Sequence, residues 1–203
     1  MRILIVNHGI IPVKLYGGTG RVIWYLGKEL AKLGHQITFL VTKGSTCNFA
    51  SVLYIDETKS IVEQIPLGFD LIHFHLRPDG LDTLRTPYII TMHGNKSPLK
   101  ELDKNTVFVS QNHAKRFSSN SFVYNGLDWD DYVKPDLNHE RSYFHFLGNA
   151  AWKVKNVKGA IGVINHLPSE RLTVLGGVRF NLKMGMRFTF SPKVRFKGMV
   201  GGE

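Results

Sequence analysis

Short apolar runs alternate with segments of helical periodicity over the first 125 residues, and this alternation constrains the fold most. Ile3 to Val6 is the first such run, and Leu71 to Phe74 is typical of those that follow. Apolar runs of this length, bounded by glycine, proline or polar residues, are typical of parallel strands buried on both faces. Further strands are expected at 37–41, 52–55, 88–92, 107–109 and 122–124, and helices at 20–33, 57–65 and 111–117. Their order predicts an α/β fold with a doubly wound parallel sheet.

The first helix has signals at both ends. Thr19 is a candidate N-cap, and Gly34 stands where a glycine ends many helices. Apolar residues between them recur at spacings of four, four and three, which places them on one helix face. The residues expected on that face are Val22, Leu26, Leu30 and Leu33.

The composition changes after residue 126. We expect an N-terminal domain at 1–133, a polar linker at 134–142 and a second domain at 143–203. The second domain offers strands at 143–147, 172–175 and 194–196, and a helix at 156–167 with Val157, Ile161 and Ile164 on one face. Three strands and one clear helix are few for a doubly wound domain, so we expect this one to be truncated.

Positive charge is concentrated in the second part of the chain. The net charge is +10, and residues 134–203 hold 12 basic and 4 acidic residues against 14 and 12 in residues 1–133. Such an excess attracts nucleic acid, anionic lipid or phosphate-bearing ligands. A protein site for single-stranded nucleic acid also needs exposed aromatic side chains on which the bases can stack. The aromatic residues at 187–190 are better explained as buried strand residues, so they give little support to such a site.

The cysteine count and the length of the apolar runs indicate where in the cell the protein is located. Cys47 is the only cysteine, which excludes an intrachain disulfide framework and a cysteine-based zinc site. No run approaches the roughly 18 apolar residues of a membrane span, and the N-terminal run is too short for a signal peptide. We expect a cytoplasmic protein with at most peripheral contact with the inner face of the membrane.

A glycine-rich loop precedes the first helix. Gly17, Gly18 and Thr19 lie where backbone N–H groups and the helix dipole favour a phosphate, although a flexible turn with a helix cap explains them equally well. A dinucleotide fingerprint does not fit, because Ile23 takes the place of its third glycine and no acidic residue follows the second strand.

Three histidines stand near the ends of predicted strands. His73 and His75 are two residues apart and share a sheet face, and His93 follows the next strand along the chain. Ligands of open α/β sheets bind at such strand ends, where a histidine can donate to a sugar hydroxyl or carry a proton. A structural role for each is the alternative. No metal is expected, because these motifs contain no carboxylate.

Lysines surround the start of the second domain's helix. Lys153, Lys155 and Lys158 flank Asn156, a candidate N-cap. A helix N-terminus with lysines can bind an anion, and a solvated basic face is the alternative.

In this order, the motifs resemble glycosyltransferase family 4, the retaining nucleotide-sugar transferases of GT-B architecture. No single motif is specific, but the ordered set covers nearly the whole chain. The matching segments are 2–6, 16–19, 34–38, 70–75, 87–94, 108–110, 123–128 and 146–148.

The resemblance implies two Rossmann-like domains that face each other across a cleft, with the acceptor on the N-terminal and most of the donor on the C-terminal domain. It implies hexosyl transfer from a nucleotide diphosphate sugar to a glycan, lipid or small-molecule hydroxyl, with no cofactor and no metal. His93 matches the family histidine near the transferred sugar and is the candidate catalytic residue. The candidate donor-binding residues are Gly17, Gly18, Thr19, Asn149 and Lys155, and the acceptor-side or sugar-side candidates are His73, His75 and Asn125.

Three departures from the family pattern bear on activity. Gly20 replaces a frequent glutamate, and Asn149 replaces an arginine that contacts the diphosphate. The family's paired glutamates, expected beyond residue 203, are missing from this sequence. We therefore expect a weakly active or inactive first half of such an enzyme. The alternatives are a non-catalytic module that self-associates through an unfinished sheet edge, and a basic nucleic-acid-binding protein.

Overall fold

The computed structural model describes residues 1–14, 17–95, 102–181, 187–188 and 191–200. Tyr16 of the glycine motif, and residues 189–190 of the segment interpreted above as strand, lie outside these ranges. The chain divides into two compact units, Met1–Val133 and Lys134–Glu203, and each has its own hydrophobic core. In the described residues, no helix is both long enough and apolar enough to span a bilayer.

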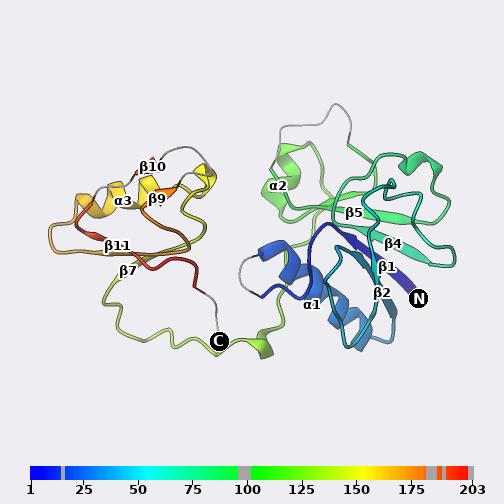
Figure 1. Cartoon of the computed structure of the whole chain (residues 1–203), viewed down its shortest axis with the longest axis horizontal. Helices are drawn as coiled ribbons and strands as arrows, with labels where there is room; N and C mark the ends of the chain where they lie inside the picture. The colour runs from blue at the N-terminus through cyan, green and yellow to red at the C-terminus, as the bar shows by residue number, and fades with distance from the viewer. Residues whose placement is uncertain (15–16, 96–101, 182–186, 189–190, 201–203) are drawn as a thin grey trace. The chain divides into compact units, whose positions relative to one another are not determined.

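Unit 1 is built on a six-stranded parallel sheet (Figure 1). Its strands are β1 (Arg2–Asn7), β2 (Gln36–Val41), β3 (Ser51–Tyr54), β4 (Leu71–Phe74), β5 (Tyr88–Met92) and β6 (Thr106–Phe108). The spatial order β3-β2-β1-β4-β5-β6 is that of a doubly wound, Rossmann-like sheet, so the predicted fold class is confirmed. The order reverses between β1 and β4, and such a switch point is where ligands of this fold bind.

Both faces of the sheet carry core residues, which explains why the strands are continuously apolar. Alternate residues of β1 separate into two clusters, with Leu4 and Val6 on one face and Ile3 and Ile5 on the other. The helix α1 (Gly18–Lys32) contributes Ile23 to the second cluster. Burial on both faces excludes water from the strand backbones and stabilises the central strands.

The predicted N-cap of α1 was wrong, and its predicted apolar face is confirmed in part, because Leu30 packs against the core. Gly17, not Thr19, is the N-cap, and it supplies no side-chain cap. The helix packs through Ile23 and Gly27, because a side chain at position 27 would collide with the ring of Phe39. A glycine therefore marks the buried face, and a pattern built on large apolar residues misses it. Leu33, expected on that face, is 74% exposed.

No helix forms at 57–65, contrary to the prediction. The segment is a series of turns closed by side chains that bond the local backbone. The Asp56 carboxylate accepts from the Thr58 N–H at 3.0 Å, and the Gln64 amide donates to the Ser60 carbonyl at 3.1 Å. Local bonds of this kind compete with the helical ladder.

The end of unit 1 contains a short helix. The helix α2 (Gln111–Arg116) is capped by the Ser110 hydroxyl, which accepts from the His113 N–H at 3.1 Å. The strand predicted at 122–124 was wrong, since only a single bridge between Phe122 and Phe108 forms there. Two 3₁₀ turns complete the unit, at Leu81–Thr83 and at Trp129–Asp131.

Unit 2 contains a three-stranded parallel sheet in the order β11 (Val194–Phe196), β8 (Leu172–Leu175) and β7 (Phe144–Leu147). Asn156 is the N-cap of its helix, as predicted, and accepts from the Gly159 N–H at 3.2 Å. The predicted apolar face is also confirmed, because Val157, Ile161 and Ile164 are all buried. The elements are β7 (Phe144–Leu147), a 3₁₀ turn (Lys153–Lys155), α3 (Val157–Asn165), β8 (Leu172–Leu175), an antiparallel pair of β9 (Phe180–Asn181) and β10 (Arg187–Phe188), and β11 (Val194–Phe196).

Candidate functional site

A row of histidines lies at the carboxyl ends of β4 and β5. The His73 Nε2 is 2.7 Å from the Thr91 hydroxyl, and the His75 Nδ1 is 2.9 Å from the His93 Nε2. The rings of His73 and His75 stack with centroids 4.2 Å apart, and those of His75 and His93 with centroids 5.2 Å apart. The sequence placed His73 and His75 on one face, and the structure adds that His93 joins them.

The register of the sheet explains these pairs. His73 stands opposite Ile89, so its partner Thr91 is displaced by two residues along β5. His75 and His93 form an equivalent pair two residues further along the chain, with the same displacement. Diagonal neighbours of this kind lie within reach of aromatic side chains. Two strands in parallel register therefore bring together residues that are 18 apart in the chain.

Burial keeps the row uncharged. His73 and His75 are each only 8% exposed. Desolvation, with a smaller contribution from His93, lowers the pKa of His73 to about 4, and desolvation also lowers the pKa of His75, to about 2. The pKa of His93 is lowered as well, first by burial and then by the nearby His113. At neutral pH the row thus offers hydrogen-bonding groups without charge.

The helix α2 supports the segment that carries His93. The Arg116 guanidinium donates to the Asn95 side-chain oxygen at 3.0 Å. His113, itself 2% exposed, packs edge-on against the ring of Phe108. No local sequence pattern marks His113, because its role depends on the position of α2 against β6.

The histidine row borders a pocket of about 480 Å³ between α1 and the sheet. Its walls are largely apolar, and they include Val22 and Leu26 of α1. These two residues were predicted to share a helix face with Leu30, and all three line the pocket. Polar side chains in the pocket lining include those of His73, His75, Thr91, His93 and Asn125.

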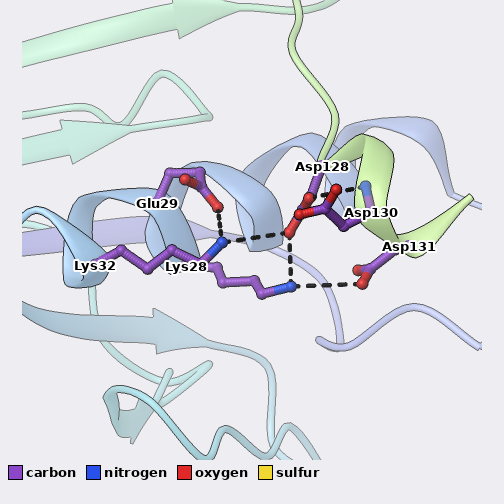
Figure 2. Close-up of polar contacts among 6 residues, drawn as sticks. All are labelled: Lys28, Glu29, Lys32, Asp128, Asp130 and Asp131. Carbon is purple, nitrogen blue, oxygen red and sulfur yellow. Dashed lines mark hydrogen bonds and ion pairs between the residues drawn. The ribbon is translucent and has the colours of Figure 1, made fainter.

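The segment 123–127 forms part of the pocket lining, and the residues after it are bound to α1 by charge (Figure 2). The Lys28 ammonium is 2.7 Å from the Asp128 carboxylate and 3.5 Å from that of Asp131. The Lys32 ammonium lies 3.6 Å from the same Asp128 carboxylate and 2.6 Å from Glu29. The Asp128 side chain is only 8% exposed, so the pair with Lys28 is partly shielded from solvent.

The glycines at the start of α1 differ in what surrounds them. Gly17 has φ +155°, in the region that favours glycine. A side chain at Gly18 would meet nothing within 4 Å, whereas one at Gly20 would stand 2.5 Å from a methyl of Val13. A side chain at Gly20 would therefore require Val13 to shift. Gly18 leaves the first turn of α1 open to a ligand.

In unit 2, the predicted anion-binding residues gather at the end of β7. The methylene stem of Lys155 lies beside Gly148, at 3.8 Å from the position of a side chain there. The side-chain oxygen of Asn149 accepts from the Ala151 N–H at 3.0 Å, so it is engaged by its own loop. Lys155 and the N-terminus of α3, capped by Asn156, are thus adjacent.

Glycines that the sequence analysis did not single out shape this end of unit 2. Gly176 follows β8 with φ +120°, and a side chain there would collide with the carbonyl group of Gly148. The Gly176 carbonyl accepts from the Ala150 N–H at 2.8 Å. The Gly176 N–H donates to the Gly198 carbonyl at 2.6 Å. The signal was a glycine directly after β7 and after β8, and another two residues after the end of β11. It is recognisable only once the strands are known to be neighbours.

The described residues include no group of three histidine, cysteine or acidic side chains able to hold a metal ion. Within unit 1, the structure places His73, His75, His93 and Asn125 on one pocket. Gly17, Gly18 and Thr19 lie apart from that lining, at the start of α1. Lys155 and Asn149 belong to unit 2.

Comparison with known proteins shows a structural likeness. The chain superposes on the crystal structure of AviGT4, a glycosyltransferase involved in avilamycin A biosynthesis, with a TM-score of 0.66 and 18% sequence identity. The match covers all of this chain and 64% of that one, so the chain spans less than two thirds of its neighbour. No protein-family model matches the sequence. No curated protein matches it either. At this identity the likeness supports the fold, which is the doubly wound architecture expected from the sequence.

Proposed function

We propose that this chain is part of a retaining glycosyltransferase of GT-B architecture, similar to family 4. Unit 1 is the acceptor-side domain, and unit 2 contributes to the donor-binding domain. The donor is a nucleotide diphosphate sugar, and the acceptor is a hydroxyl of a glycan, lipid or small molecule. The fold that the chain shares with a glycosyltransferase supports this assignment.

The observation that carries the proposal is the uncharged histidine row at the switch-point edge of the sheet. His75 and His93 are hydrogen-bonded to each other at 2.9 Å beside a pocket with few other polar groups. Sugar hydroxyls bind to hydrogen-bond donors and acceptors at fixed positions, and a neutral histidine ring offers one of each. His93, the less buried member of the pair, contacts the transferred sugar in this account.

Unit 2 supplies the electrostatic part of the reaction. As the bond from the anomeric carbon to the phosphate oxygen breaks, the leaving nucleoside diphosphate takes the electron pair. Lys155 and the backbone N–H groups at the start of α3 stabilise that negative charge. The acceptor oxygen forms the new bond to the same carbon, and its proton passes to an oxygen of the leaving diphosphate. In unit 1, Gly17 and Gly18 at the open first turn of α1 are further candidate diphosphate contacts.

Calorimetric titration of the whole chain with UDP, GDP and their sugar conjugates tests the proposal. We expect saturable binding of one nucleotide series, at least about tenfold weaker in Lys155→Ala. Arg171→Ala is the matched control, because it removes an exposed positive charge at the other end of the strands, just before β8. No binding of any nucleotide, or equal weakening by both substitutions, would contradict the proposal.

A further inference from the structure

His75 is placed to control His93 and has little access of its own. Its Nδ1 is 2.9 Å from the His93 Nε2, and the two rings are inclined by only 26°. Its Nε2 is buried and has no hydrogen-bond partner in the described part of the chain. Only one His75 nitrogen is therefore engaged, and its partner is the residue to which the proposed function assigns the sugar contact.

Two arrangements of hydrogen are compatible with a neutral pair. In one, the His75 Nδ1–H donates to His93, and the buried His75 Nε2 is a bare nitrogen. In the other, the His93 Nε2–H donates to His75, and the buried His75 Nε2 carries an N–H that no described group accepts. Orphaned N–H donors are rarer in protein interiors than under-satisfied acceptors, which favours the first arrangement.

We infer that His75 is a positioning residue that donates its Nδ1–H to the Nε2 of His93 and thereby holds His93 as its Nδ1–H tautomer. The hydrogen bond made by one ring nitrogen sets which nitrogen carries the proton. A free histidine side chain favours the opposite, Nε2–H tautomer, so the neighbour has to impose this state. The burial that lowers the pKa of both rings keeps the pair neutral at physiological pH.

The tautomer decides what His93 can do. With its Nε2 occupied as an acceptor, the ring offers the Nδ1–H, which is a hydrogen-bond donor and not a base. On the proposed function, from which this step follows, His93 then donates to a hydroxyl oxygen of the sugar. Proton abstraction from the acceptor falls to another group.

Nitrogen NMR on the whole chain with ¹⁵N-labelled histidine reads the tautomer directly, without any substrate. We expect the His93 signals of a ring protonated at Nδ1 and bare at Nε2. In His75→Leu the donor is lost, and His93 should shift towards the Nε2–H form. In His75→Asn a side-chain amide near the position of Nδ1 restores the donor, so the Nδ1–H form should persist.

His73→Leu is the matched control, because it removes the neighbouring ring, which bonds Thr91 and not His93. The His93 tautomer should be unchanged in it. An Nε2-protonated His93 in the unsubstituted chain would overturn the inference, as would an unchanged tautomer in His75→Leu. Should His75→Leu fail to fold, the tautomer of the unsubstituted chain and the rescue in His75→Asn still decide the question.

Nucleotide titration separates this inference from the proposed function. His75→Leu should bind a nucleotide sugar about fivefold to tenfold more weakly and the bare nucleoside diphosphate equally well. If the tautomer is as expected but no nucleotide sugar binds, the proposed function fails and the positioning role of His75 stands. If nucleotide sugars bind and the tautomer is the opposite one, the inference alone fails.

Discussion

The Lys28 ammonium lies 2.7 Å from the Asp128 carboxylate and joins α1 to a turn one hundred residues later in the chain (Figure 2). The same carboxylate accepts from the Asp130 backbone N–H at 3.1 Å. These contacts hold the segment that follows Asn125 and Leu127, both of which line the pocket. The ion pair therefore stabilises one wall of the candidate site.

Asp128→Asn should loosen that wall. The Lys28 bond, and next the Asp130 N–H, hold the pKa of Asp128 below its usual value. The Asp128 carboxylate therefore stabilises the fold fully above about pH 4, and this stabilisation is lost as the pH falls through the lowered pKa of Asp128. Hydrogen exchange of the amides at 123–132 should become faster in Asp128→Asn at pH 7. Asp130→Asn is the control, since Asp130 contributes its backbone N–H, and equal effects of the two substitutions would contradict this role.

Gly18→Ala and Gly20→Ala should separate binding from folding. A methyl at Gly18 meets nothing within 4 Å, so Gly18→Ala should raise the free energy of unfolding by up to about 1 kcal/mol. If the diphosphate approaches this glycine, the same methyl should weaken nucleotide binding. A methyl at Gly20 meets Val13 at 2.5 Å and should cost about 1–3 kcal/mol. Thermal unfolding and calorimetric titration measure the two effects, and a stable Gly20→Ala would contradict the packing account.

The glycine after β8 should be essential to unit 2. Gly176→Ala forces a side chain at φ +120° against the Gly148 carbonyl, which should cost roughly 2–4 kcal/mol. Gly162→Ala, in the middle of α3 with nothing within 4 Å, should stabilise the unit by about 1 kcal/mol. Hydrogen exchange of the β7 and β8 amides reports both changes. Similar protection in the two variants would show that the glycines at the strand ends are not constrained as described.

The buried histidines predict a pH dependence of stability. The pKa of His73 is about 4 in the folded chain, against about 6.5 for an exposed histidine, so the unfolded state binds the proton first. The free energy of unfolding should therefore fall as the pH decreases from about 6.5 towards 4, by on the order of 3 kcal/mol from this residue. His73→Leu should flatten the curve in denaturant titrations at several pH values. An unchanged slope would show that His73 is already charged or is not buried in solution.

The sheet could be predicted from the sequence because local patterns carry its signal. β4 and β5 have the predicted bounds, since each is an apolar run with a clear start in Asp70 or Pro87. The helix α3 was predictable because Asn156 caps it and three apolar residues share its buried face. The helix expected at 57–65 failed because Asp56 and Gln64 offer the backbone other partners.

The site was predictable only in part, because its geometry depends on contacts between strands. His73 and His75 could be placed on one face from their spacing, but the bond from His75 to His93 depends on the register between β4 and β5. The shared helix face of Val22 and Leu26 could be predicted from their spacing. That these two residues line a pocket depends on Gly27, which sets how closely α1 approaches Phe39. The interactions that define the site are long-range ones, and a single sequence does not encode them in any local pattern.

The central claim is that a nucleoside diphosphate binds to unit 2 at the start of α3, beside Lys155. Backbone amide chemical shifts during titration with UDP and GDP measure this most directly. The account predicts saturable changes at residues 148–157. Changes confined to other surfaces of the chain would contradict it.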